Sequence, residues 1–183
     1  MFEIIAAKIS GHPPDVPAAA VNVIFQVRGP RVVIAVLVGA ALAVAGAAFQ
    51  GLFRNPLVSP DLLGASSGAA LGAVLGIYLS LGVFAIQVLA FVGGLAAVVA
   101  VYLIGSTIRA RDPILLLVLT GVVIGALLGA CVGLVKYIAD PYNQLPAMTF
   151  WLLGSLAGAS AADLIPLFGP VALGILICAV VAG

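Results

Sequence analysis

Side chains able to do chemistry are few in this sequence, and they are not grouped as catalysis or metal binding requires. The one histidine, His12, lies in a Gly-His-Pro-Pro stretch, and the two cysteines, Cys131 and Cys178, lie inside apolar runs without metal-ligand spacing. No G-x-x-x-x-G-K-S/T phosphate loop occurs. We therefore expect no catalytic site, metal site or cofactor, and no ATP hydrolysis by this chain itself.

Two arginines three residues apart are the clearest binding groups. Arg28 and Arg31 enclose Gly29 and Pro30 and stand directly before a run, 32–53, that carries no charge. A guanidinium fork pairs well with a carboxylate, so both side chains could bind acidic groups. The alternative is that they snorkel from a membrane helix to the interface.

Polar side chains inside the apolar runs are few and uncharged. The candidates to line a weakly polar pathway are Gln50, Ser66, Ser67 and Thr120. No carboxylate, histidine or lysine lies midway along an apolar run. Proton-coupled transporters usually need such a group within the bilayer, so a proton antiporter is disfavoured.

The elements that must position these residues are membrane helices. The 183 residues are 64% hydrophobic and only 7% charged, whereas soluble domains carry about 25% charged residues. So few charges cannot cover a water-soluble surface. A net charge of +1 leaves no footprint for nucleic acid.

Long uncharged runs predict the number of membrane spans. Crossing a bilayer takes about 20 apolar residues, and the run 62–108 is long enough for two spans with a tight turn near Ser80-Leu81-Gly82. The predicted spans are 31–53, 62–80, 83–106, 113–137 and 164–182. We therefore expect an all-α, polytopic membrane helix bundle with about five transmembrane helices.

The segment from Asp140 to Asp163 is too apolar for a solvated loop and too broken for a span. It predicts an interfacial helix with Tyr142 and Trp151 at headgroup depth. Before the second predicted span, Asp61 is a candidate N-terminal cap.

Two rows of glycines recur at intervals of four residues, which places each row on one helix face. They are Gly64, Gly68, Gly72 and Gly76, and Gly121, Gly125, Gly129 and Gly133. Small residues allow membrane helices to approach closely, so both rows predict tight helix packing. The alternative is that glycine is simply common in membrane helices.

Two sequence blocks together resemble one family. From Arg28 to Gly72 the chain reads RGPRVVIAVLVGAALAVAGAAFQGLFRNPLVSPDLLGASSGAALG, and from Phe150 to Gly158 it reads FWLLGSLAG. Both are similar to the permease subunit of FecCD-type ABC importers, which take up iron-siderophore complexes, haem or cobalamin. Gly29 departs from the family, which usually has an apolar residue there.

The resemblance assigns roles to several residues. It implies that a substrate-binding protein docks at Arg28 and Arg31. It implies a cytoplasmic gate at Asn55, Pro56 and Leu57, and, by position alone, a second gate at Arg111, Asp112 and Pro113.

The resemblance also implies the assembly. A homodimer of permeases would sit in the inner membrane as multi-pass proteins, with cytoplasmic ATPase subunits and a periplasmic or lipid-anchored binding protein, and would import a metal chelate. Residues 1–183 would then be one partial permease domain, without the family's first helix and C-terminal half. A secondary transporter or channel and a non-functional membrane fragment are the alternatives.

Overall fold

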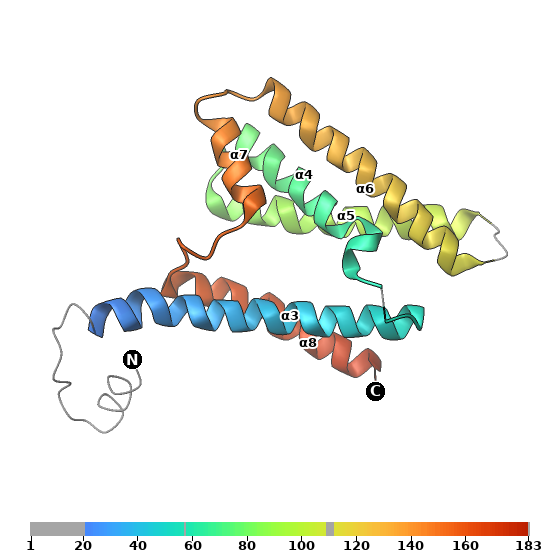
Figure 1. The fold of residues 1–183 in the computed structure, drawn as a ribbon, viewed down its shortest axis with the longest axis horizontal. Helices are drawn as coiled ribbons and strands as arrows, with labels where there is room; N and C mark the ends of the chain where they lie inside the picture. Colours follow the sequence, from blue (N-terminus) through green and yellow to red (C-terminus); the bar gives the residue numbers. More distant parts are fainter. Residues whose placement is uncertain (1–20, 57, 109–111, 183) are drawn as a thin grey trace. The chain divides into compact units, whose positions relative to one another are not determined.

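The computed structural model describes residues 21–56, 58–108 and 112–182, and this part of the chain contains helices and no strand. A π-helix, Val23–Arg28, leads directly into α3, Gly29–Phe53. The remaining helices are the 3-10 turn Pro60–Leu63, α4 (Ala65–Tyr78), α5 (Val83–Thr107), α6 (Pro113–Ile138), α7 (Gln144–Leu153), the 3-10 turn Ala161–Asp163 and α8 (Leu164–Ala182). Figure 1 shows their order along the chain.

The predicted all-α membrane fold is confirmed. Four helical stretches of the described chain are long and apolar enough to cross a bilayer: Val23–Phe53, Val83–Thr107, Pro113–Ile138 and Ala161–Val180. Large apolar side chains stay on their surfaces, such as Phe84 and Phe91 on α5, which are 74% and 70% exposed. Such surfaces suit lipid or other helices rather than water.

The fifth predicted span, 62–80, is shorter than expected. Helix α4 has 14 residues, about 21 Å at 1.5 Å per residue, which is less than the hydrocarbon thickness of about 30 Å. Its start is fixed by Gly64, whose φ of +71° separates it from the turn Pro60–Leu63. At its other end the predicted tight turn is present, and Ser80 has a φ of +53°.

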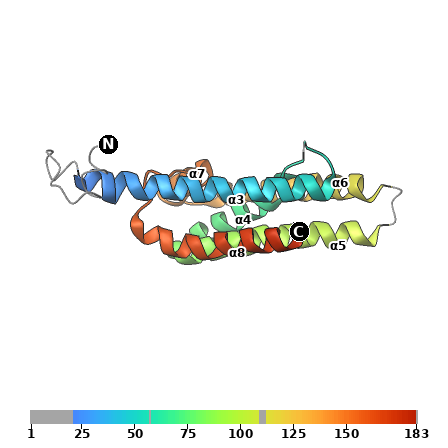
Figure 2. The ribbon, with the colours of Figure 1, turned by 90° about the horizontal axis from the view of Figure 1, so that it is seen from below.

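The chain divides into two compact units. One takes in α3 as far as Ala45 together with the chain from Ser155 onward, and the other runs from Gly46 to Gly154. In the second unit α4 packs against both α5 and α6. Figure 1 shows the three helices, and Figure 2 shows the ribbon turned by 90°. The interpretation of 1–183 as one permease domain stays a prediction.

Two clusters of buried side chains hold the unit Gly46–Gly154 together. One joins the end of α3 to the loop after it and to α5, through Phe53, Val58, Leu63 and Val101. The rings of Phe49 and Phe53 stack beside it with centroids 6.0 Å apart. The other joins the C-terminal part of α4 to the chain around α7, through Val74, Ala139 and Met148.

A short helix does form within the segment predicted to be interfacial. Helix α7 has ten residues, and the side chains of Tyr142 and Trp151 are 87% and 39% exposed. Their depth at the headgroups stays a prediction.

Candidate functional site

The two candidate docking arginines stand where a π-helix meets an α-helix. Pro30 has no N–H, and a proline ring inside a helix clashes with the carbonyl four residues back. The π-helix that precedes it has a wider turn, and the Gly29 N–H accordingly bonds the carbonyl of Ile24, five residues back. A Cβ on Gly29 would lie 3.1 Å from that carbonyl oxygen. Glycine in place of the family's apolar residue thus fits a crowded turn.

Arg28 and Arg31 differ in surroundings. Arg28, the last residue of the π-helix, is exposed. Arg31 is half-buried, and its Nη2 donates a hydrogen bond to the backbone oxygen of Ala157, in the segment after α7. The Nε of Arg31 is buried without a hydrogen-bond partner in the described chain. The structure therefore joins the two sequence blocks that carry the family resemblance, through Arg31.

The candidate gate after α3 is a strained turn on a buried support. Arg54 has a φ of +48°, which L-residues rarely adopt, and the N–H of Asn55 bonds the Gln50 oxygen at 3.1 Å. Phe53 before the turn and Val58 after it are both 7% exposed. Their burial anchors the loop, while Arg54, Asn55 and Pro56 themselves stay exposed. Leu57 lies outside the described residues.

Of the candidate second gate, the structure describes Asp112 and Pro113, and Asp112 caps the start of α6. The Asp112 carboxylate accepts hydrogen bonds from the backbone N–H groups of Ile114 and Leu115, both at 3.1 Å. Pro113 follows at the first helical position, where its missing N–H costs little. Arg111 lies outside the described residues, so a gate here stays a prediction.

Asp61 does not cap α4 as expected. Gly64 is the N-cap residue and no side chain bonds there, because the 3-10 turn Pro60–Leu63 separates Asp61 from the helix. Instead the Ser66 hydroxyl donates to the Asp61 carboxylate.

The structure shows how exposed the candidate pathway residues are and which groups they contact. Gln50 and Ser66 are exposed, and Ser67 is half-buried. The Thr120 hydroxyl donates to the Leu116 oxygen of its own helix at 2.8 Å. These contacts do not place the four around one cavity, and pathway lining by them stays a prediction.

The glycine row on α4 faces the backbone of α5. A Cβ on Gly72 would lie 2.6 Å from the carbonyl carbon of Leu89, and one on Gly68 would lie 2.6 Å from the Cβ of Ala97. Real side chains do not approach so closely, so only glycine fits at these positions. At Gly76 the nearest atom, on Ile86, would be 3.1 Å away. Gly64 faces α6, at Gly121 and Gly125, rather than α5.

The row on α6 is in contact over only half its length. A Cβ on Gly121 would lie 2.9 Å from the carbonyl carbon of Leu62, and one on Gly125 would lie 3.6 Å from the Ser67 hydroxyl oxygen. Gly129 and Gly133 face open space, with no described atom within 4 Å. Close packing at these last two positions is therefore absent within the described chain.

Sequence reasoning missed the partner of the α4 row. Gly93 and Gly94 on α5 approach Gly68 and Ala65 of α4, and Ala90 and Ala97 on α5 are 8% and 4% exposed. These four form a small-residue face at intervals of three and four. That spacing was readable, but the intervening Phe and Val residues hide it from a search for glycines alone.

A side-chain amide secures the turn between α6 and α7. Gln144 donates to the Tyr78 backbone oxygen at 2.7 Å and accepts from the Asp140 N–H at 3.1 Å. The pKa of Asp140 lies below its ordinary value because the Asn143 side chain, foremost, and the Tyr142 N–H bond its carboxylate. The loop is thus tied to the last carbonyl of α4, that of Tyr78.

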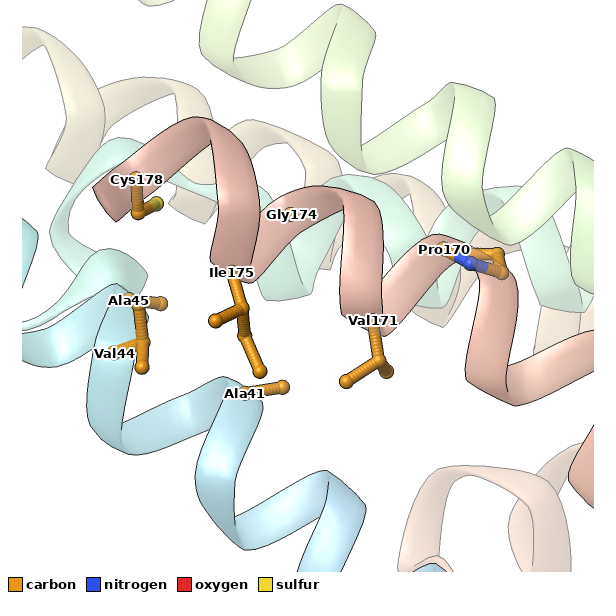
Figure 3. A pocket seen from close by; sticks show the side chains of 8 residues that line it. All are labelled: Ala41, Val44, Ala45, Pro170, Val171, Gly174, Ile175 and Cys178. Carbon is orange, nitrogen blue, oxygen red and sulfur yellow. The ribbon is translucent and has the colours of Figure 1, made fainter. Parts of the chain in front are cut away.

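A cavity of about 210 Å³ lies between α3 and α8 (Figure 3). Its lining is apolar: Ala41, Val44, Ala45, Pro170, Val171, Gly174, Ile175 and Cys178. Apart from the weakly polar Cys178 thiol, it offers no charged or hydrogen-bonding side chain to a polar solute. No group of three or more histidine, cysteine or acidic side chains that could hold a metal ion occurs in the described chain.

Comparison with known proteins places this geometry in context. The family model described as the FecCD transport family matches residues 1–183. The molybdate import system permease protein MolB of Haemophilus influenzae is 38% identical over 149 residues, covering 81% of this chain and 44% of that protein. The hemin transport system permease protein HmuU of Yersinia pestis is 42% identical over 146 residues, covering 76% and 43%.

A solved structure is also similar. It belongs to a protein assigned as a metal-chelate type ABC transporter, in an inward-facing conformation, with 36% identity and a TM-score of 0.78. The match covers 87% of this chain and 50% of that one. The chain thus spans less than half the length of the curated relatives named above, and half of the solved chain.

Proposed function

Because the chain belongs to the FecCD transport family, with a match over residues 1–183, we propose that it is part of the membrane-spanning permease subunit of an ATP-driven importer. The family match is the observation that carries this proposal. The chain is a multi-pass protein of the inner membrane, with permease relatives and, among its described residues, four apolar helices of membrane length. Permeases of this family are not themselves catalytic, so the ATPase is a separate subunit.

The proposed cargo is a metal chelate, such as an iron-siderophore complex, haem or cobalamin. Relatives of this chain include permeases of hemin, cobalamin and iron chelatin transport systems, together with a molybdate system. Among the described residues no polar or charged side chain is buried, so the bundle interior offers no ligand that would strip a metal. The chelate would pass intact, and the binding protein would select it.

The partners follow from the same proposal. A second permease copy would complete the pathway, two ATPase subunits would bind on the cytoplasmic side, and a binding protein would dock at the arginine end of α3. Exposed Arg28 supports this last contact, because a free guanidinium suits an acidic partner.

The proposed gates lie at the other end of α3 and before α6. The gate Asn55-Pro56-Leu57 is supported by the burial of Phe53 and Val58 on its two sides, while Asn55 and Pro56 stay exposed. The second gate, Arg111-Asp112-Pro113, rests on position alone. Movement of this segment would act on the Asp112 cap at the start of α6.

Copurification of the full-length permease from detergent tests this function. We expect an ATPase subunit and a binding protein to copurify with it. Replacing both arginines, as Arg28→Glu with Arg31→Glu, should release the binding protein and leave the ATPase bound. The matched control is Arg54→Glu, because this exposed arginine directly follows the other end of α3.

Two outcomes would contradict the proposal. A permease that purifies without any ATPase, and still moves substrate, would be a secondary transporter or channel. Charge pairs are strongest at low salt. If the double variant binds the binding protein there as tightly as the unaltered permease does, the arginines are not part of the docking surface.

A further inference from the structure

The segment that follows α7 is built from local turns. Gly154, with a φ of +70°, ends the helix. The Ala157 N–H bonds the Ser155 hydroxyl at 3.0 Å, and the Ala159 N–H bonds the Leu156 oxygen at 3.1 Å. Residues 154–158 are exposed. Single turns of this kind hold a chain weakly, so the position of the segment depends on contacts from elsewhere.

Arg31 supplies such a contact from 126 residues away. Its Nη2 donates to the Ala157 oxygen, and its Nε is buried with no partner in the described chain. A carboxylate that binds a guanidinium side-on needs Nε and Nη2 together. On Arg31 one of these donors is engaged and the other is covered, so the side-on fork is closed to a partner.

Arg28 has the opposite character. It is exposed, and its side chain makes no hydrogen bond or ion pair in the described chain. The helix carries it one turn before Arg31. Its five N–H donors stay available to an acidic surface.

We propose that the two arginines have different tasks: Arg31 is a positioning residue that fastens segment 155–159 beside the start of α3, and Arg28 alone presents a free charge to the docking protein. The docking surface then includes backbone and side chains of segment 155–159 as well as Arg28. The docking part of this inference rests on the proposed function, whereas the fastening of the segment does not.

The fastening is tested without any partner. A spin label is placed at Leu156→Cys, a side chain that is 41% exposed, in full-length protein whose Cys131 and Cys178 are replaced by alanine. Arg31→Gln should increase the mobility of the label, and Arg28→Gln, the matched control, should leave it unchanged. Arg31→Lys should give an intermediate spectrum, because an ammonium can donate to one carbonyl but lacks the fork.

The division of tasks is tested by the salt dependence of docking. Arg28→Gln should weaken docking about two- to fivefold at low salt and flatten its salt dependence, as loss of an exposed charge does. Arg31→Gln should weaken docking about tenfold, the usual effect of losing a charge-assisted hydrogen bond, with the salt dependence unchanged. The probe is the binding protein that copurifies with the permease.

Each result decides one part. Unchanged label mobility in Arg31→Gln overturns the fastening, even if the docking experiments succeed. Flattened salt dependence in Arg31→Gln shows that Arg31 pairs directly with the partner and overturns the division of tasks. If no protein docks on the unaltered permease, the proposed function fails, and the label still decides whether Arg31 positions the segment.

Discussion

Gly68 and Gly72 on α4 face the α5 backbone so closely that no side chain fits, whereas Gly129 and Gly133 on α6 have no described atom within 4 Å. The two rows have the same four-residue spacing in sequence. The spacing of the glycines therefore determines which face of a helix lacks side chains, but not which element packs on that face.

The connections between helices explain the difference. Only four residues, 79–82, join α4 to α5, so α5 returns directly along α4 and meets its glycine face. The first half of the α6 row meets the 3-10 turn Pro60–Leu63 and the start of α4. Its second half extends past these elements. A partner from outside the described chain, such as the proposed second permease copy, could cover it.

The largest effect is expected at the glycine of α4 that lies closest to the α5 backbone. Gly72→Ala should destabilise the helix pair by about 1–3 kcal/mol or more, because the methyl group would overlap the Leu89 carbonyl and force the helices apart. Unfolding in detergent with increasing denaturant measures the change.

Gly129→Ala is the matched control for that substitution. With open space at its Cβ, it should leave the unfolding free energy of this chain unchanged or slightly raised, since alanine favours helix over glycine by about 1 kcal/mol in water. Equal destabilisation by both substitutions would contradict the contrast between the rows. Reduced association of two permeases, with unchanged folding, would show that a second copy covers the α6 row.

The packing of the end of α4 can also be destabilised without changing its glycines, by removing the hydrogen bonds of Gln144. Gln144→Leu removes the donor to the Tyr78 oxygen and the acceptor for the Asp140 N–H. We expect a loss of about 1–3 kcal/mol, because both backbone groups are left unpaired at part-buried sites. Hydrogen exchange should rise at residues 140–144 and at the end of α4. Unchanged exchange would mean that packing around Met148 alone holds this end.

A smaller effect is expected at the start of α6. Asp112→Ala removes the cap that accepts from Ile114 and Leu115, which should cost about 1 kcal/mol. Asp112→Asn, which keeps an accepting oxygen, should retain most of that stability. If transport falls in Asp112→Asn while stability is kept, the charge has a task beyond capping, as the second-gate proposal requires.

The smallest expected effect is a pH dependence of the folding stability, which arises from Asp140 in the loop between α6 and α7. The folded pKa of Asp140 lies below its unfolded value, chiefly through the Asn143 side chain. Its contribution to stability is therefore present above the unfolded pKa, about 3.9, and is lost as pH falls through the folded pKa. Thermal unfolding between pH 7 and pH 3 should show less acid sensitivity in Asp140→Asn. An identical pH profile would exclude Asp140 as the source.

Much of the fold could be predicted from the sequence because the bilayer imposes simple lengths. The uncharged runs predicted α3, α5, α6 and α8 with bounds within a few residues of the structure. The 62–80 span was overestimated because an apolar run does not show that Gly64 adopts a positive φ and separates a 3-10 turn from α4. The π-helix before Pro30 left no periodic signal.

The candidate site was predictable only in part. The resemblance marked Arg28 and Arg31 as one pair, and composition could not tell an exposed guanidinium from one bonded to Ala157. Such a contact joins residues 126 positions apart, so no local pattern encodes it. Asp112, in contrast, directly precedes a proline and an apolar run, which is a readable capping signal.

Reconstituted uptake tests the central proposal most directly. The full-length permease, its ATPase and the binding protein are placed with a labelled iron chelate, haem or cobalamin in proteoliposomes. Accumulation that requires both ATP on the ATPase side and the binding protein on the other side, and that falls in Arg28→Glu, is the predicted result. Accumulation driven by an ion gradient without ATP would contradict it.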